Sequence, residues 1–191
     1  MNTNINDNKN RFIEIYKKSI QRQGADKLLD WLINESDFFT APASTRYHGS
    51  YEGGLCRHSL NVYERLVTKF PNTSAADSFE MRGLLHDICK ANFYTVEMRN
   101  QKIDGKWEQV PYYAVDDKLP YGHGEKSVYI ISGFMKLNRD EAMAIRWHMG
   151  GFDESVKGGS YSMSAAFEMY PLCVMLHTAD MMATYLDEAE R

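Results

Sequence analysis

Apolar residues recur at helical spacing along most of the chain. The clearest run steps by four, three, four and three residues, which is typical of the buried face of an amphipathic helix, and Pro71 ends it. Its apolar positions are Cys56, Leu60, Tyr63, Val67 and Phe70. Similar patterns predict further helices over residues 11–21, 25–33, 77–89, 124–136, 139–148, 165–169 and 171–188. The sequence therefore predicts a mainly α protein.

One segment breaks the helical pattern. Residues 93–96 and 112–115 are rich in aromatic and β-branched side chains, as strands are, and Asp104-Gly105 stands between them. Asp-Gly is a preferred two-residue hairpin turn because both turn positions need a positive φ. We therefore expect a β-hairpin over about 93–115, inserted into one helical domain that spans residues 11–191.

Bulk properties narrow the class of protein. A chain of 191 residues suits one domain with a single core. The net charge is −4, whereas a dedicated duplex-DNA binder is expected to carry a strongly basic surface. The charge therefore argues against nucleic acid as an obligatory partner. Three cysteines without a C-x-x-C pair favour a reduced, cytoplasmic compartment. The polar, Asn-rich residues 1–10 are expected to be disordered and are not a signal peptide, and no apolar stretch approaches the ~18 residues of a membrane span.

Polar residues with metal-binding chemistry interrupt the apolar helices. His58 lies at the edge of a predicted buried face, and His86 and Asp87 are adjacent in an otherwise apolar segment. The last predicted helix carries a polar stripe that includes His177 and Asp180. These side chains need partners, because a buried polar group without one costs about 1–3 kcal/mol. Imidazole and carboxylate together suit divalent Mn, Fe, Zn, Ni or Co, and helical bundles build such sites from facing helices.

The order of these residues resembles a known family. His58, then His86-Asp87, then Asp180 is similar to the H…HD…D signature of HD-domain metal-dependent phosphohydrolases. The segment around the HD pair resembles the H-D-I-G-K form of that signature, with Cys89 where glycine is commoner. The resemblance covers most of the chain and implies a compact helical HD domain.

Two further histidines extend the resemblance. His123 and His148 are similar to the extra histidines of two-metal members, which include the HD domain of bacterial 3′→5′ exoribonucleases and the two-metal HD phosphodiesterases. Such members often carry a second histidine where this chain has Met149. The resemblance therefore implies one or two bound divalent transition metals, whose identity stays open.

The resemblance also implies roles for individual residues. One metal would be held by His58, His86, Asp87 and Asp180. A second metal would be held by His123 and His148, with Asp87 bridging the two metals. Lys90 would face the substrate phosphate, and His177 would either orient a ligand or the bound water, or be a hydrogen-bonded core histidine. The implied catalytic residues are Asp87, Lys90 and His177, and the implied metal ligands are His58, His86, Asp87, His123, His148 and Asp180.

The function that the resemblance implies is hydrolysis of a phosphomonoester or phosphodiester in a nucleotide or short oligonucleotide, by a metal-activated water. Arg46, Arg57 and Arg146 are candidates for contacting the substrate phosphate, while the loop residue His48 is expected to be exposed. Two alternatives stay open: a 3′→5′ exonuclease on single-stranded nucleic acid, and a non-catalytic nucleotide-sensing module. The expected partner is a phosphorylated small molecule or nucleotide, and a short single-stranded nucleic acid stays open as a partner. No membrane partner is expected, and a homo-oligomer stays open.

Overall fold

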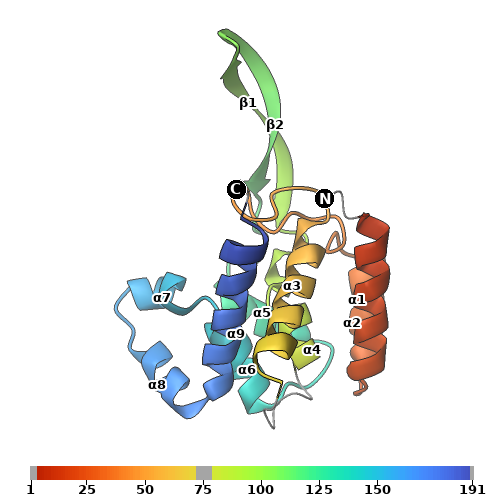
Figure 1. The fold of residues 1–191 in the computed structure, drawn as a ribbon, viewed down its shortest axis with the longest axis vertical. Helices are drawn as coiled ribbons and strands as arrows, with labels where there is room; N and C mark the ends of the chain where they lie inside the picture. The colour runs from red at the N-terminus through yellow and green to blue at the C-terminus, as the bar shows by residue number, and fades with distance from the viewer. Residues whose placement is uncertain (1–3, 72–78, 190–191) are drawn as a thin grey trace.

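The protein is a helical bundle from which one β-hairpin projects (Figure 1). The structure is a computed structural model that describes residues 4–71 and 79–189. The prediction of a mainly α fold with an inserted hairpin is confirmed. The helices are α1 (Ile5–Ser19), α2 (Ala25–Asn34), α3 (Gly54–Lys69), α4 (Phe79–Leu85), α5 (His123–Ser132), α6 (Arg139–Trp147), α7 (Glu154–Lys157), α8 (Ser162–Met169) and α9 (Pro171–Met182), with shorter helical turns η2 (Ile88–Lys90), η3 (Gly150–Phe152) and η4 (Ala183–Asp187). None of the described helices has the length and apolar character of a membrane span.

Helix α3 contacts helices on several sides. It packs against α4, α9 and α1. Gly83 permits the close approach of α4, because a Cβ at this position would lie 2.6 Å from the Cα of Tyr63 in α3. Leu60, Leu84 and Leu176, one from each of α3, α4 and α9, are fully buried in the core. The C-terminal end of α4 is therefore held against α3.

The polar N-terminal segment is helical from Ile5 onward. The prediction of a disordered stretch over 1–10 is wrong from that residue on, because α1 begins there. The side chain of Asn4 accepts a hydrogen bond from the backbone N–H of Asn6 and caps the helix start. Asn8 is buried, and α1 lies against α3 and α4. Tertiary packing thus orders a segment whose composition predicts disorder.

The hairpin consists of β1 (Tyr94–Ile103) and β2 (Lys106–Val115), which pair antiparallel. Asp104 and Gly105 form the turn with φ of 48° and 85°, which confirms the prediction made from the Asp-Gly pair. The strands are longer than their aromatic ends predict, and their far half extends well beyond the bundle (Figure 1).

The helix predicted over 77–89 ends earlier than expected, and its predicted start lies outside the described residues. Helix α4 stops at Leu85, and His86 and Asp87 form a turn before η2. Asp87 has φ −104° and ψ 18°, a bridge conformation in which many active-site residues are found. The two residues of the HD pair therefore leave the helix and turn toward the bundle interior, where both are buried.

The C-terminal helices position most of the remaining candidate residues. Helix α6 begins with a capping box, in which Asn138 and Glu141 exchange side-chain and backbone hydrogen bonds. Helix α9 begins at Pro171, as predicted, and continues into the π-helical turn η4. Helix α6 packs against both α5 and α9. These contacts bring His123, at the start of α5, to His148, just after α6, with ring centroids 5.1 Å apart.

Candidate metal centre

A cluster of histidine and aspartate side chains lies where the helices converge. Its members come from α3, the turn after α4, the start of α5, the end of α6, and α9. Their ligand atoms form overlapping groups, and within each group these atoms lie within 4.8 Å of one another. The cluster consists of His58, His86, Asp87, His123, His148 and Asp180, the full ligand set expected from the sequence. Buried histidine and aspartate groups are thus positioned to hold a metal ion.

Asp87 lies at the centre of this cluster and uses both carboxylate oxygens. Its Oδ1 lies 2.8 Å from Nε2 of His123 and 3.3 Å from Nε2 of His148. Its Oδ2 lies 3.6 Å from Nε2 of both His58 and His86. Asp87 therefore contacts both pairs of histidines and joins them into one cluster.

Asp180 completes the side of the cluster formed by α3 and α9. Its Oδ1 lies 3.2 Å from Nε2 of His58, and it also groups with His86 and His148. His58 and His86 face each other with their Nε2 atoms 3.3 Å apart. All these contacts involve Nε2, so the histidines present the same ring atom to one shared space.

Hydrogen bonds at Nδ1 fix this orientation. Nδ1–H of His86 donates to the backbone carbonyl of Gly83 at 3.0 Å, and Nδ1–H of His148 donates to that of Ile145 at 2.6 Å. Because a carbonyl only accepts, Nδ1 carries the proton, and Nε2 of the neutral ring presents a lone pair. The Nε2 of His148 is buried and has no hydrogen-bond partner among the described residues. Metal-bound histidines are held in this way, with the second ring nitrogen donating a hydrogen bond.

A cation would pair with the lone pairs of the nitrogen and oxygen atoms that face one another in the cluster. With Nδ1 protonated, the lone pair of His148 Nε2 faces the Asp87 carboxylate, so two acceptors meet. A buried acceptor left unsatisfied costs about 1–3 kcal/mol. A divalent metal, or a proton in its place, removes this cost. The mixture of imidazole and carboxylate fits Mn, Fe, Co, Ni or Zn better than the oxygen-rich sites of Ca or Mg.

The charges of the cluster also suit a metal. Burial lowers the pKa of His58, but the carboxylates of Glu188 and Asp180 outweigh burial and raise it to about 10. Burial lowers the pKa of His86 to about 3, so this ring is neutral at pH 7. Burial raises the pKa of the Asp87 carboxyl, but the Lys90 ammonium, together with the hydrogen bond from His123, outweighs burial and holds this pKa well below its usual range. The cluster thus combines ionised carboxylates with a proton that a metal displaces on binding.

Cys89 contacts His123 at Nδ1, the ring nitrogen that does not face Asp87. Its Sγ lies 3.6 Å from Nδ1 of His123, whose Nε2 faces Asp87. The backbone N–H of Cys89 donates to the hydroxyl of Ser127 in α5 at 3.2 Å, which ties the segment after the HD pair to this helix. The cysteine at the position where the family pattern favours glycine therefore contacts a candidate ligand.

Lys90 adds a positive charge at the edge of the cluster. Its Nζ donates to Oδ2 of Asp87 at 2.7 Å, and its side chain is 12% exposed. Burial lowers the pKa of Lys90, but the Asp87 carboxylate outweighs burial and raises it. Lys90 also lines two cavities, so this cationic residue contacts a candidate metal ligand and borders open space as well.

Two cavities have Lys90 in their lining. One has a volume of about 620 Å³ and reaches His123, and the other has a volume of about 790 Å³ and reaches Asp87 and Asp180. Both volumes lie in the range of about 300–1,000 Å³ that ligand sites occupy. The two cavities share Lys90, Met149, Phe152 and Lys157 as lining residues. The cluster is therefore reached through a cleft with two arms.

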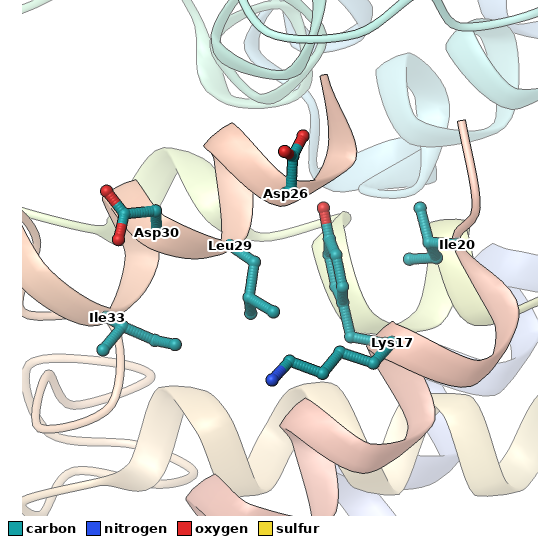
Figure 2. A pocket seen from close by; sticks show the side chains of 7 residues that line it. Lys17, Ile20, Asp26, Leu29, Asp30 and Ile33 are labelled. Atoms are coloured by element: carbon teal, nitrogen blue, oxygen red, sulfur yellow. The ribbon is translucent and has the colours of Figure 1, made fainter. Parts of the chain in front are cut away.

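A separate cavity of about 350 Å³ lies between α1 and α2 (Figure 2). Its wall mixes apolar side chains such as Leu29 with the charged side chains of Lys17 and Asp26. It shares no lining residue with the cleft and contains no histidine or cysteine. This cavity is therefore not part of the candidate metal centre.

His177 contacts the backbone beside a candidate ligand. Its Nδ1–H donates to the carbonyl oxygen of His148 at 2.7 Å. Its ring also packs on Gly150, where φ is +54° and an added Cβ would lie 2.5 Å from the ring. His177 lines the larger arm of the cleft. It is thus placed to hold the 148–150 backbone, and its side chain is not among the groups that could hold the ion.

The three candidate arginines lie in different surroundings. Arg46 lines the larger arm of the cleft. Arg57 lines another depression, whose lining residues come from α3 and η4, and Arg146 pairs with Asp153 at 2.7 Å and with a glutamate of α5. His48, which was expected to be exposed, is half-buried and lines the same arm as Arg46. The structure thus brings Arg46 and His48 to the cleft and places the other two arginines elsewhere.

Two residues of the centre were missed by the sequence analysis. Glu188 contacts His58, and Lys157 lines both arms of the cleft. The polar stripe that contains His177 and Asp180 steps by three and four residues, and one further step of four beyond Thr184 reaches Glu188. This periodicity is a signal that could have found Glu188. Lys157 lies in a glycine-bracketed segment whose sequence gives no comparable signal.

Comparisons of the chain with family models, with curated proteins and with solved structures gave no match. The likeness to HD-domain proteins therefore rests on the residues themselves, and what the structure adds is a buried histidine–aspartate cluster compatible with a metal site of that type.

Proposed function

We propose that the protein is a metal-dependent phosphohydrolase that cleaves a phosphomonoester or phosphodiester of a nucleotide. The observation that carries this proposal is the convergence of histidine Nε2 atoms and two aspartates on one buried space, with Lys90 beside it at a cleft. A lysine that stands next to metal ligands and also faces a cavity is suited to an anionic substrate.

A divalent metal in this cluster would lower the pKa of a water molecule and withdraw charge from a phosphoryl oxygen. Lys90 would add its positive charge to the oxygens of the same phosphoryl group. The carboxyl pKa values of Asp87 and Asp180 are both lowered, so these ionised side chains, which line the larger arm of the cleft, would balance the charge of a bound cation. In the net reaction, oxygen from water forms a bond to phosphorus, the ester P–O bond breaks, and the leaving alcohol takes a proton.

The walls of the larger arm favour a nucleotide as substrate. Arg46 and Lys157 supply positive charge, while Tyr47 and Tyr185 are exposed aromatic rings on the same arm. Aromatic faces stack on nucleobases, with a contribution of about 1–3 kcal/mol per base. Because the smaller arm shares Lys90 with the larger one, the cleft also has room for the further substituent that a diester carries.

The experiment is a substrate screen on metal-free protein supplied in turn with Mn, Fe, Zn, Ni and Co. The substrates are nucleoside mono-, di- and triphosphates, cyclic dinucleotides and short single-stranded RNA. We expect metal-dependent release of phosphate or a phosphomonoester, and a rise in KM for Arg46→Ala that the matched control Arg57→Ala does not share. The proposal fails if no phosphate ester is cleaved with any of these metals.

Two outcomes would redirect the proposal. Cleavage confined to single-stranded RNA, one nucleotide at a time from the 3′ end, would make the protein an exonuclease. Tight nucleotide binding without turnover in a metal-loaded protein would make it a sensing module.

A further inference from the structure

We propose that Glu188 is a positioning residue for the metal centre: it holds the ring of His58 so that Nε2 faces the metal. Glu188 follows η4, at the C-terminal end of the described chain, and no pattern in the sequence analysis assigned it a role. The inference rests on the metal-binding part of the proposed function and is independent of the substrate.

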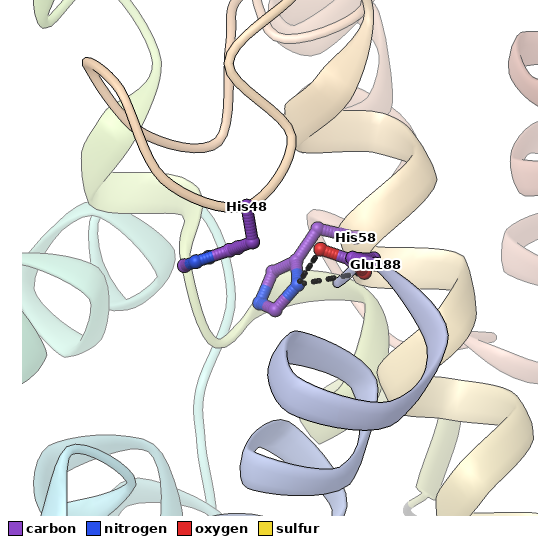
Figure 3. Close-up of side chains that lie close together, drawn as sticks. All are labelled: His48, His58 and Glu188. Carbon is purple, nitrogen blue, oxygen red and sulfur yellow. Dashed lines mark hydrogen bonds and ion pairs between the residues drawn. The ribbon is translucent and has the colours of Figure 1, made fainter. Parts of the chain in front are cut away.

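The contact between the two side chains is close and buried (Figure 3). Both carboxylate oxygens of Glu188 lie 3.1 Å from Nδ1 of His58, and the two side chains are 6% and 1% exposed. Asn61, one turn further along α3, donates its side-chain N–H to Oε1 of Glu188 at 2.7 Å. The carboxylate is therefore itself fixed, and it accepts a hydrogen bond from Nδ1–H of His58, while Nε2 faces Asp180 and His86.

The helix position of His58 explains why it needs an acceptor from elsewhere. His86 and His148 stand just after helices, where the last carbonyls lack partners within the helix and can accept from Nδ1. His58 lies inside α3, where the preceding carbonyls accept hydrogen bonds from the helix itself. A side chain from another element must therefore fix its ring, and Glu188 is the group that reaches it.

His48 does not supply this contact. Its ring lies beside that of His58, with centroids 4.9 Å apart, but its Nε2 has no hydrogen-bond partner within residues 4–71 and 79–189. His48, His58 and Glu188 also lie close enough to hold an ion of their own. In that arrangement His58 would have to bind cations through both ring nitrogens, which requires loss of the remaining ring proton. The hydrogen bond to Glu188 requires no such step and is the arrangement known to orient metal-bound histidines.

The test measures metal affinity rather than hydrolysis. Titration calorimetry with Mn or Zn on metal-free protein compares wild type with Glu188→Ala, Glu188→Asp and Glu188→Gln. The matched control is Asp187→Ala, because Asp187 ties the same segment to α3 through Arg65, at 2.7 Å, without touching His58. Thermal melts of each variant show whether it is folded.

We expect Glu188→Ala to weaken metal binding about 10- to 100-fold, the usual cost of removing a group that orients a ligand. Glu188→Asp should weaken it as well, because the shorter side chain withdraws the carboxylate from Nδ1. Glu188→Gln should lie between wild type and Ala, since its amide oxygen still accepts from Nδ1–H. Asp187→Ala should bind metal as wild type does.

Wild-type affinity in folded Glu188→Ala, or in folded Glu188→Asp should the alanine variant fail to fold, would overturn the inference. An equal loss of metal affinity in Asp187→Ala would also overturn the inference, because attachment of the 187–188 segment to α3 would then account for the effect. A protein that binds metal but cleaves no phosphate ester would refute the proposed function and leave this inference intact.

Discussion

The replacement of Asp87 by asparagine tests the centre of the cluster most directly. The substitution keeps the size of the side chain and removes its charge. Both oxygens of Asp87 are in use, with Oδ1 at 2.8 Å from His123 and Oδ2 at 2.7 Å from Lys90. The neutral amide offers no negative charge to the Lys90 ammonium or to a metal, so both lose their counter-charge. We therefore expect losses in metal content, in rate and in the stability of the metal-free protein.

The magnitudes follow from these contacts. Two unit charges at the 2.7 Å separation of Lys90 and Asp87 attract by about 6 kcal/mol at an effective dielectric constant of about 20, before desolvation is subtracted. Removing one partner of a buried ion pair costs about 3–5 kcal/mol, which is the expected fall in the free energy of unfolding of metal-free Asp87→Asn. The rate of the proposed hydrolysis should fall by about 10³-fold or more, because the substitution would disturb both the metal and the water that it would activate.

Elemental analysis, urea unfolding and steady-state kinetics on the same preparations decide the matter. Lys90→Ala serves as the comparison: it should lose about 10²-fold in rate, as when one electrostatic donor is removed, and retain its metal. His177→Ala should lose about 10- to 100-fold in activity or metal affinity, through the backbone that His177 holds. Full activity and full metal content in Asp87→Asn would refute the reasoning. A Lys90 variant as inactive as Asp87→Asn would show that the lysine acts in the chemical step itself.

Three further predictions concern metal number, acid stability and packing. His148→Ala should lose about one equivalent of metal by elemental analysis and keep another, and unchanged content would favour a single metal position that does not use this ring. Burial raises the pKa of the Asp153 carboxyl, but hydrogen bonds from Ser155 and Arg146 outweigh burial and lower this pKa. The ionised Asp153 therefore stabilises the folded state above the unfolded pKa of about 3.9, and this stabilisation is lost as the pH falls through the folded pKa. Asp153→Asn should therefore lower Tm at pH 7, and its difference from wild type should shrink below about pH 4; a constant difference in calorimetric melts would contradict this. Gly83→Ala should lower the free energy of unfolding by about 1–3 kcal/mol, measured in urea, because its Cβ would push α4 away from the backbone of α3; an unchanged urea midpoint would contradict it.

The sequence alone determined the helical class and most of the elements. The spacing of apolar residues is a local property of one helix face, so α2, α3 and α6 were predicted close to their observed bounds, and the helix predicted over 171–188 corresponds to α9 together with η4. The turn at Asp104-Gly105 was predictable for a similar reason, since the conformations that these two residues tolerate depend little on distant contacts. The order of the histidines and aspartates along the chain was enough to identify the six members of the cluster, because each interrupts a predicted apolar face or extends the family pattern.

Only the tertiary structure decided how these residues are used. Which ring nitrogen faces the cluster depends on acceptors that come from distant segments, as with Glu188 for His58. The end of α4 at Leu85, which turns Asp87 inward, is not visible in the periodicity of the 77–89 segment. The arginine that lines the cleft could not be chosen from the sequence, because exposure and pairing depend on neighbours that folding brings together. The ordered start of α1 has the same cause, since a polar segment becomes helical when the bundle supplies the contacts that its own composition lacks.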